Sequence, residues 1–470
     1  MLGILTGWLD SLIGIFSLIG FHSLVWVSLY KVCNMNWKKV AQLSLVHVGV
    51  TITVVPITST LNRIMIADLH LSALLVGLLV ACPYLFSPLQ VVIGNWADKN
   101  PIWGRHRSPW MVLGGLMAAF GSYFTAHAIF LFQSNFVLGL LASLLAFTIW
   151  GIGVNIASVS YLSLVSELSV ADVNWRNRAV SVMWTAMIIF IILTALMLAR
   201  MLEPYSREAL YTAFGVVWLV AILCVLVGAA GVEPATVAGR AVKNKAENPL
   251  VAFRLLANNP AALRFFVYLL LVLISIHAQD VLLEPFGGEV LQMPVAMTSR
   301  LTSIWGVGLL ITLTGGMLLV RRYGKKKCAN MGGALAALAF ALIIGAGLIH
   351  NVRFFMGAVF LLGLGGGIMT ISNLSFMLDM TLPQAAGLYI GAWGVADFIG
   401  RAIGTILSGF LRDLLYQVTG QAIVGYSVVF GLEIIGLLMV ILLFRHISVD
   451  EFRRNAELHL HDVLAMVGNG

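Results

Sequence analysis

Charged side chains are scarce in this sequence. Asp, Glu, Lys and Arg together make up 10% of the 470 residues, whereas hydrophobic residues make up 60%. A soluble domain would carry roughly a quarter charged residues, so the composition excludes a soluble globular protein. Long polar stretches are missing too, which leaves no room for a separate catalytic domain. The sequence therefore predicts a polytopic membrane protein.

Cysteines and familiar catalytic motifs are also few. The four cysteines lie in or near apolar segments without a metal-binding spacing or a disulfide framework, and we interpret them as small core residues: Cys33, Cys82, Cys224 and Cys328. A P-loop, a Gly-x-Ser-x-Gly, a His-Glu-x-x-His and a Cys-x-x-Cys motif are all absent from the sequence. We therefore expect no enzyme site, no bound metal ion and no nucleotide.

Apolar windows of about 20 residues, long enough to cross a bilayer as helices, dominate the chain. We identify twelve, at 41–62, 72–94, 109–132, 136–166, 178–201, 209–231, 261–284, 298–320, 328–349, 352–378, 385–411 and 421–444. The longest polar gap divides them into six and six. Two six-helix halves around a basic central loop resemble the layout of major-facilitator transporters, whose halves are structural repeats.

We accordingly expect an all-α membrane protein with a major-facilitator-type fold and 12 core transmembrane helices. Its expected regions are an N-terminal apolar extension, a first half, a cytoplasmic linker, a second half and a cytoplasmic tail, at 1–35, 36–232, 233–260, 261–445 and 446–470. Residues 8–30 are too long and too aromatic for a typical signal peptide. They form either an additional span or a helix lying in the membrane interface.

Basic residues are distributed unevenly between the loops. Twenty-one of the 28 Lys and Arg residues fall in loops that would share one side of the membrane, six fall on the other side, and Arg401 lies inside a span. Positive charge marks the cytoplasmic side, so we expect the C-terminus in the cytoplasm. Topology then explains the net charge of +8, and we expect no nucleic-acid binding.

The stretch 277–289 is the most informative part of the chain. Its polar residues are His277, Gln279, Asp280, Glu284 and Glu289. Asp280 and Glu284 are four residues apart, so on a helix they share one face. Pro285 is expected to end the helical hydrogen-bond ladder. Carboxylates are costly in hydrocarbon, so either the helix emerges into water here or this face is functional.

Other ionisable residues also fall within apolar windows. Asp397 and Arg401, four residues apart, either neutralise each other or line a central cavity. Three further histidines lie in apolar windows: His22, His47 and His127. A neutral imidazole can ligate the magnesium of a chlorin, but a hydrogen-bonded core histidine is the simpler interpretation of each. Three carboxylates lie at or near span ends, where contact with water explains them: Glu167, Asp379 and Glu433.

The loop after the second window contains a glycine-rich and basic pattern. Its residues are Gly94, Asp98, Gly104, Arg105 and Arg107. The pattern resembles the cytoplasmic loop motif of major-facilitator proteins, in which the aspartate pairs with a basic residue or a helix N-terminus. Such a loop holds the cytoplasmic side closed. The interval between Asp98 and Gly104 is longer than in that motif, so the match is partial.

Four stretches carry a more specific resemblance. They are Asp-Val-Leu-Leu-Glu-Pro-Phe-Gly-Gly-Glu at 280–289, Ser-Thr-Leu-Asn-Arg-Ile-Met-Ile at 59–66, Arg-His-Arg-Ser-Pro-Trp at 105–110 and Gly-Leu-Tyr-Ile-Gly-Ala-Trp-Gly at 387–394. The chain resembles the PucC/LhaA family over about 36–445, and the first of these motifs is the most distinctive. Members of that family assist the assembly of light-harvesting complexes in phototrophic bacteria and their cyanobacterial relatives.

The resemblance implies an assembly factor in the photosynthetic inner membrane of a bacterium. Such a factor would deliver or hold (bacterio)chlorophyll, with or without a carotenoid, while antenna polypeptides insert. The implied partners are the antenna polypeptides, reaction-centre or pigment-biosynthesis proteins and the lipid bilayer, and 277–289 would contact the pigment or an antenna helix. Two alternatives remain open: an ion-coupled transporter of a small solute, and an assembly scaffold without pigment.

Overall fold

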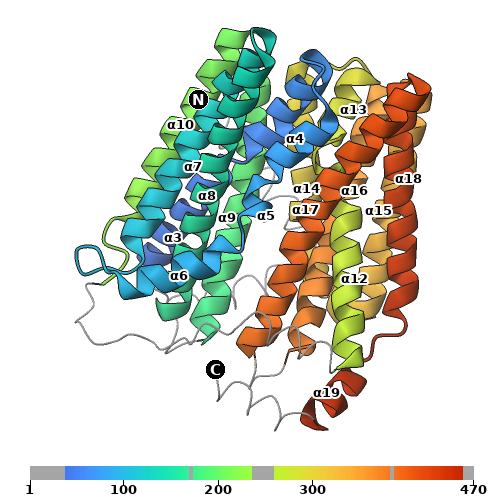
Figure 1. Cartoon of the computed structure of the whole chain (residues 1–470). Coiled ribbons are helices and arrows are strands. Elements are labelled where there is room, and N and C mark those ends of the chain that lie inside the picture. Colours follow the sequence, from blue (N-terminus) through green and yellow to red (C-terminus); the bar gives the residue numbers. More distant parts are fainter. Residues whose placement is uncertain (1–36, 169–172, 235–258, 382–385, 459–470) are drawn as a thin grey trace, which may run out of the picture.

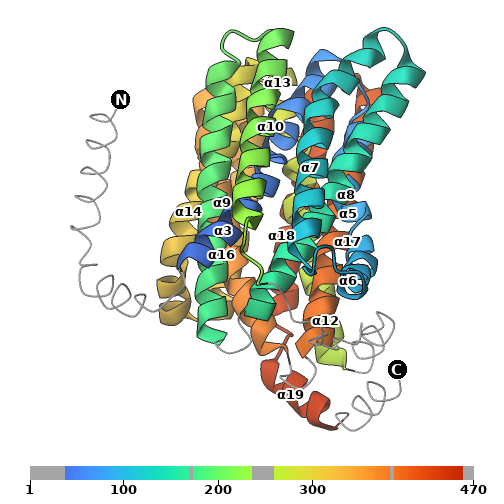
Figure 2. The same cartoon turned by 90° about the vertical axis from the view of Figure 1, so that its left-hand side faces the viewer.

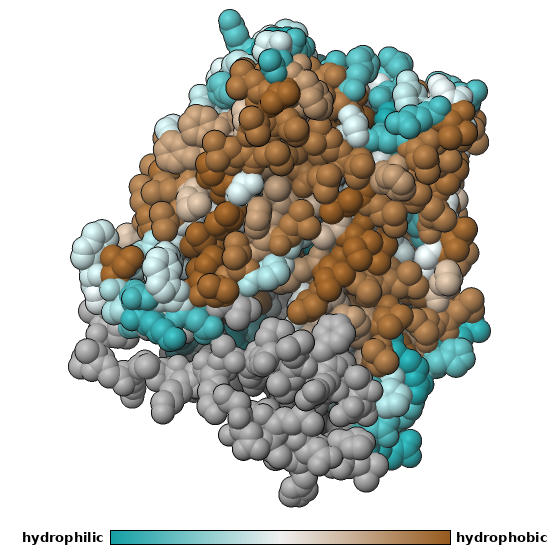
Figure 3. All heavy atoms as spheres, viewed as in Figure 1, coloured by the Kyte–Doolittle hydropathy of each residue, from teal (hydrophilic) through white to brown (hydrophobic). Residues whose placement is uncertain are grey.

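The structure is a computed structural model, and it describes residues 37–168, 173–234, 259–381 and 386–458. Within these ranges, ten helices are long and apolar enough to cross a membrane. Each coincides with one of the last ten predicted windows. Figure 3 shows a broad hydrophobic belt between hydrophilic patches toward the two ends of the molecule. The predicted all-α membrane fold is confirmed.

The long helices run side by side in two groups. The first half (blue to green) lies on the left of Figure 1 and the second half (yellow to red) on the right, and Figure 2 views the bundle from the side of the first half. The first half contains α7 (Ser108–Ala128), η3 (Ile129–Gln133), α8 (Phe136–Leu168), α9 (Val173–Met201) and α10 (Arg207–Ala229). The second half contains α12 (Pro260–His277), α14 (Val295–Tyr323), α15 (Lys325–Leu348), α16 (Val352–Asp379), α17 (Ala386–Thr419) and α18 (Ala422–Phe444).

The first predicted window is an interrupted helix. It consists of α3 (Trp37–Thr51), a turn, and the π-helical segments η1 (Ile57–Leu61) and η2 (Ile64–Asp68). Pro56 lacks an amide donor and crowds the carbonyl four residues earlier, so a regular helix cannot continue through it. Ser122 Oγ of α7 donates to the Thr53 carbonyl within the turn (2.8 Å). A neighbouring helix thus replaces a hydrogen bond that the interruption removes.

The second predicted window is divided as well. It forms α4 (Ala73–Val80), α5 (Cys82–Leu85) and α6 (Leu89–Lys99). Pro83 lies in the first turn of α5, where a missing amide donor is tolerated. α4 packs against α17 of the other half, and a Cβ atom at Gly77 would lie 2.8 Å from the Thr405 carbonyl oxygen. The glycine therefore lets the backbones of the two halves touch.

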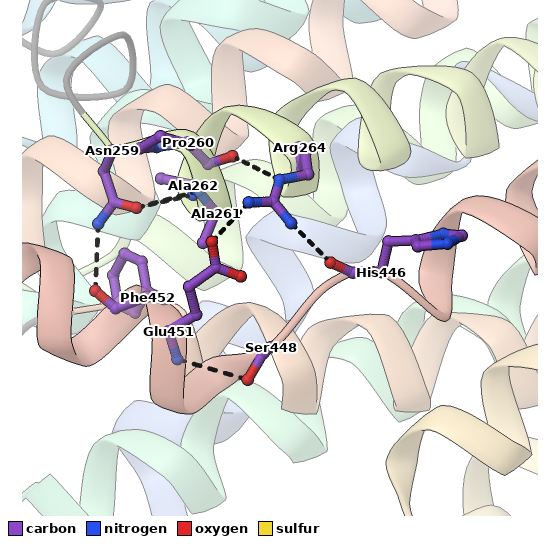
Figure 4. Close-up of polar contacts among 9 residues, drawn as sticks. All are labelled: Asn259, Pro260, Ala261, Ala262, Arg264, His446, Ser448, Glu451 and Phe452. Atoms are coloured by element: carbon purple, nitrogen blue, oxygen red, sulfur yellow. Dashed lines mark hydrogen bonds and ion pairs between the residues drawn. The ribbon is translucent and has the colours of Figure 1, made fainter.

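The start of α12 is tied to the short helix α19 (Val449–Leu458), as Figure 4 shows. Asn259 caps α12, because its Oδ1 accepts from the amides of Ala261 and Ala262 (3.1 and 3.2 Å) while its Nδ2 donates to the Phe452 carbonyl (3.1 Å). Arg264 pairs with Glu451 (2.5 Å). The described part of the predicted tail therefore packs on the second half. The predicted extension 1–35, most of the linker 233–260 and residues 459–470 lie outside the described residues.

Candidate functional site

The first crossing of each half is an interrupted helix. In the first half it is built from α3, η1 and η2, and in the second half from α12, the 3-10 turn η4 (Ala278–Asp280) and α13 (Leu283–Glu289). In transporters built from repeats, interrupted helices at corresponding positions of the two halves mark the binding site. π-helical turns are also frequent at functional sites. The two crossings therefore define the candidate site.

Pro285 lies near the start of α13 and does not end a helix. The expected helix end is wrong, because the interruption precedes Pro285 and α13 continues to Glu289. Proline is tolerated in the first turn of a helix. It leaves the Val281 carbonyl without an amide partner four residues later. Asn62 Nδ2, from the other half, donates to that carbonyl instead (3.4 Å).

Largely buried polar side chains join the two halves at this point. We call them the polar seam, and they are Thr60, Asn62, Arg63, Glu284, Ser299 and Thr302. Glu284 is 5% exposed; its Oε2 accepts from Asn62 Nδ2 (3.2 Å) and its Oε1 from Thr302 Oγ1 (3.0 Å). The hydroxyl oxygens of Thr60 and Ser299 are 2.8 Å apart. Glu284 thus connects the two interrupted crossings and does not emerge into water.

Arg63 provides the basic group of the polar seam. It pairs with Asp68, and its Nη2 donates to the Met293 carbonyl (3.2 Å). Its Nε is buried and has no hydrogen-bond partner among the described residues. A Cβ atom at Gly288 would lie 2.8 Å from this Nε. The second glycine of the Gly-Gly pair therefore makes room for the guanidinium group.

Glu289 is also engaged and is not simply exposed at a helix end. It pairs with Arg412, and Tyr426 Oη donates to its Oε2 (2.7 Å). Arg412 pairs further with Asp413 (3.0 Å), whose Oδ2 accepts from the Leu74 amide at the start of α4 (2.9 Å). These contacts fix α4, α13, α17 and α18 to one another beside the polar seam.

His277 and Asp280 form a pair next to the interruption. His277 Nδ1 lies 2.8 Å from Asp280 Oδ2, and Gln279 Nε2 donates to Asp280 Oδ1 (3.2 Å). Because a carboxylate only accepts, Nδ1 is the donor of this bond, and in the neutral tautomer that fits it Nε2 carries the lone pair. The turn at 281–282 separates Asp280 from Glu284. The expectation that they share one continuous helical face is therefore wrong, and they bind different partners.

Asp397 and Arg401 pair on α17, as their spacing predicts, with Arg401 Nε 2.9 Å from Asp397 Oδ2. The Arg401 guanidinium carbon lies 5.8 Å from the centre of the Tyr84 ring on α5 of the first half. Asp280 is within electrostatic range of both Tyr84 and Arg401. The structure thus brings the predicted pair close to the predicted 277–289 stretch.

Two of the other predicted histidines are packed inside the first half. The His47 ring stacks on Tyr161 with 5.1 Å between ring centroids. The His127 ring stacks on Tyr211 at 4.2 Å, and its Nδ1 lies 3.2 Å from the Tyr123 carbonyl oxygen. His127 matches the hydrogen-bonded core histidine of the simpler interpretation, whereas His47 is a packed core histidine whose Nδ1 has no hydrogen-bond partner among the described residues. His22 lies outside the described residues.

The predicted cytoplasmic loop motif begins in α6 and ends before α7. Gly94 lies in α6 in ordinary contact with Val159, while Gly104 takes a φ of +69°, a conformation that favours glycine. Arg105 exchanges backbone hydrogen bonds with Ile102 (3.0 Å). The side chain of Asp98 lies outside what the structure describes.

Arg107 and the start of α7 are held by Glu167 of the first half and by Glu233, the first residue of the predicted linker. Arg107 pairs with Glu167 at the end of α8 (2.7 Å). Glu233 accepts the backbone amides of His106, Arg107 and Ser108 at distances of 2.6–3.1 Å. A carboxylate is favourable at a helix N-terminus. A contact of this loop that closes the cytoplasmic side remains a prediction.

Three functional-site candidates were missed by the sequence reasoning. Asn62 and Arg63 were part of the 59–66 motif, and their polar side chains inside an apolar window were the available signal. Glu433 was expected near water at a span end. That expectation is wrong, since Glu433 lies in the middle of α18 and is 2% exposed. The helices packed around α18 cover this side of it.

The fold places the chain in a class. It matches a crystal structure of the nucleoside transporter NupG with a TM-score of 0.66 at 16% identity, covering 87% of this chain and 99% of that one. A D-xylose-proton symporter matches with a TM-score of 0.63 at 16% identity, covering 88% and 98%. The chain is therefore a multi-pass membrane protein with a major-facilitator-type fold.

The family follows from the sequence comparison. The model described as PUCC protein matches residues 60–452, and the chain belongs to that family. Protein PucC of Cereibacter sphaeroides is 28% identical over 409 residues, covering 84% of this chain and 89% of the relative. A protein of Rhodobacter capsulatus named Bacteriochlorophyll synthase 44.5 kDa chain is 28% identical over 415 residues, covering 85% and 93%. The resemblance seen in the motifs is confirmed.

Proposed function

We propose that this protein is a non-enzymatic assembly factor for light-harvesting complexes. It holds or delivers (bacterio)chlorophyll while antenna polypeptides insert into the bacterial inner membrane. Family membership is the observation that carries this proposal, and the bacteriochlorophyll-related name of one relative supports it. The uneven distribution of basic residues between the loops supports a cytoplasmic C-terminus for this assembly factor. The proposed partners are antenna polypeptides and reaction-centre or pigment-biosynthesis proteins.

The chain offers a group that fits a chlorin. Asp280 accepts from His277 Nδ1 and so orients the ring, leaving the Nε2 lone pair available to a metal. A bound chlorin would supply a magnesium ion that can accept a nitrogen ligand from the protein. Of the histidines that the structure describes in the predicted set, His277 has this carboxylate-oriented arrangement. His277 would bind the magnesium, and Asp280 would fix the tautomer of the imidazole.

The double variant Asp280→Ala/Glu284→Ala tests the role of this region in a phototrophic host. Antenna complexes should fall well below the wild-type level while the variant protein accumulates normally. Glu203→Gln is a matched control, because Glu203 forms an exposed ion pair with Arg300 and neither residue belongs to the interrupted crossings. Wild-type antenna levels in the double variant would count against the proposal.

Ion-coupled transport of a small solute is a second candidate. The likeness of the fold to solved transporters and the buried Glu284 favour it. It predicts ion-dependent uptake into proteoliposomes without pigment or antenna polypeptides. A pigment-free scaffold, by contrast, predicts co-purification with antenna polypeptides and no uptake.

A further inference from the structure

Glu433 lies at the centre of α18, eleven residues from either end of the helix, and is 2% exposed. Neither of its carboxyl oxygens has a hydrogen-bond partner among the residues that the structure describes. A carboxylate in this place loses its hydration without compensation, whereas a neutral carboxylic acid loses much less. The surroundings of Glu433 therefore favour its protonated form.

The elements around Glu433 do not compensate a negative charge. α18 contacts α12, η4, α13, α15 and α17, and Asp280 of η4 is a like charge within electrostatic range. The acidic groups of α13, Glu284 and Glu289, are bonded elsewhere. Six of the described basic groups of these elements are bonded to other partners: His277 to Asp280, Arg401 to Asp397, Arg412 to Glu289, Arg264 to Glu451, Lys325 to Asp379 and Lys326 to the Ile447 carbonyl. Lys327 lies in the first turn of α15.

A second unsatisfied group lies on the turn that contacts α18. Gln279 Oε1 in η4 is buried and has no hydrogen-bond partner in the described ranges. One turn along α18 from Glu433, Gly436 packs directly against Ser275 of α12. A neutral carboxylic acid has an O–H donor that a carboxylate lacks. A protonated Glu433 would therefore add an O–H donor to the interface of α18 with α12 and η4, where Gln279 Oε1 is an unsatisfied acceptor.

We propose that Glu433 is a proton-binding site that couples the interrupted crossing α12–α13 to pH. Glu433 holds a proton while η4 packs against α18, and releases it when this contact opens and water reaches the carboxyl group. In that step the O–H bond breaks, the proton passes to water, and the carboxylate keeps the electron pair. The site requires neither a pigment nor an antenna polypeptide.

Infrared spectroscopy of the pigment-free full-length protein in lipid nanodiscs tests the protonation directly. Glu433→Gln is close in shape to the neutral acid. The wild-type protein should show the carbonyl band of a protonated carboxylic acid at neutral pH, and this part of the band should be missing from Glu433→Gln and kept in Glu203→Gln. A band that is undiminished in Glu433→Gln would overturn the proposal.

Hydrogen–deuterium exchange of peptides covering 278–289 tests the coupling. Wild type and Glu433→Gln are compared at equal pH, which cancels the intrinsic exchange rate. Each opening of the wild-type protein releases one proton from Glu433. Once opening is coupled to this release, the opening constant of wild type divided by that of Glu433→Gln should rise about tenfold for each pH unit. A ratio that is independent of pH contradicts the proposal. If Glu433→Gln does not fold, both measurements are made on the wild-type protein over the same pH range. The proposal requires the infrared acid band and the exchange of residues 278–289 to change over the same pH interval, and changes over separate intervals contradict it.

Discussion

Asn62 joins the two interrupted crossings of the candidate site through a single side chain. Its amide donates both to the Val281 carbonyl and to Glu284, while its Oδ1 accepts from the Arg63 backbone amide (2.7 Å). Each partner is buried, so each would be left unsatisfied if the amide were lost. Asn62 thus links the 59–66 motif with the 280–289 motif through hydrogen bonds.

Replacing Asn62 with alanine should lower the free energy of unfolding by about 1–3 kcal/mol, the cost of leaving buried acceptors unpaired. Chemical unfolding in detergent micelles measures the change. Asn100→Ala is the control, since the Asn100 side chain bonds the Trp96 carbonyl at an exposed position, and should change stability by less than about 0.5 kcal/mol. Equal changes in the free energy of unfolding for the two substitutions would show that the hydrogen bonds of Asn62 in the polar seam do not stabilise the fold.

His277 and Asp280 have separable roles if the pair holds a chlorin. His277→Ala should remove the proposed magnesium ligand and abolish stoichiometric pigment. Asp280→Asn should weaken pigment binding by about 10–100-fold, because it removes the group that orients the ligand. Pigment titration followed by absorbance distinguishes the two, and His127→Ala serves as the control. Unchanged binding in both variants would exclude His277 as the ligand.

At the scale of elements, the sequence predicted the positions of the membrane-spanning helices better than the positions of the interruptions within them. Ten of the twelve predicted windows coincide with long spans of the structure, because long apolar runs can be recognised without knowledge of neighbouring helices. The interruption at 278–282 was not predicted, since Pro285 suggested a helix end and the amide that satisfies the Val281 carbonyl comes from Asn62, more than 200 residues away. The burial of Glu433 depends in the same way on packing by other helices.

Pro285→Ala should restore an amide donor to the Val281 carbonyl within α13. That bond competes with Asn62, so exchange at 281–286 should slow by roughly fivefold, equivalent to about 1 kcal/mol for one hydrogen bond. Antenna accumulation should fall with it. Pro260→Ala is the matched control, because Pro260 occupies the first turn of α12, where an amide donor is not needed. Faster exchange in Pro285→Ala would contradict the role given to Pro285.

At the scale of the whole molecule, the polar contacts between the halves gather at one end. The polar seam and the Asp413–Leu74 bond, which both join the halves, lie there, and the ribbons of the two halves diverge toward the end that carries α19 (Figure 1). The topology expected from the basic loops places the seam end away from the cytoplasm. A molecule joined at one end can open at the other without losing the seam, as facilitator-type transporters do.

The absorption spectrum of the protein purified in mild detergent from a native phototroph, followed by solvent extraction, tests the central claim most directly. We predict at least one chlorin per protein chain in preparations that are free of antenna polypeptide. Pigment that appears only together with antenna polypeptides, or a colourless protein, would contradict a pigment-holding assembly factor.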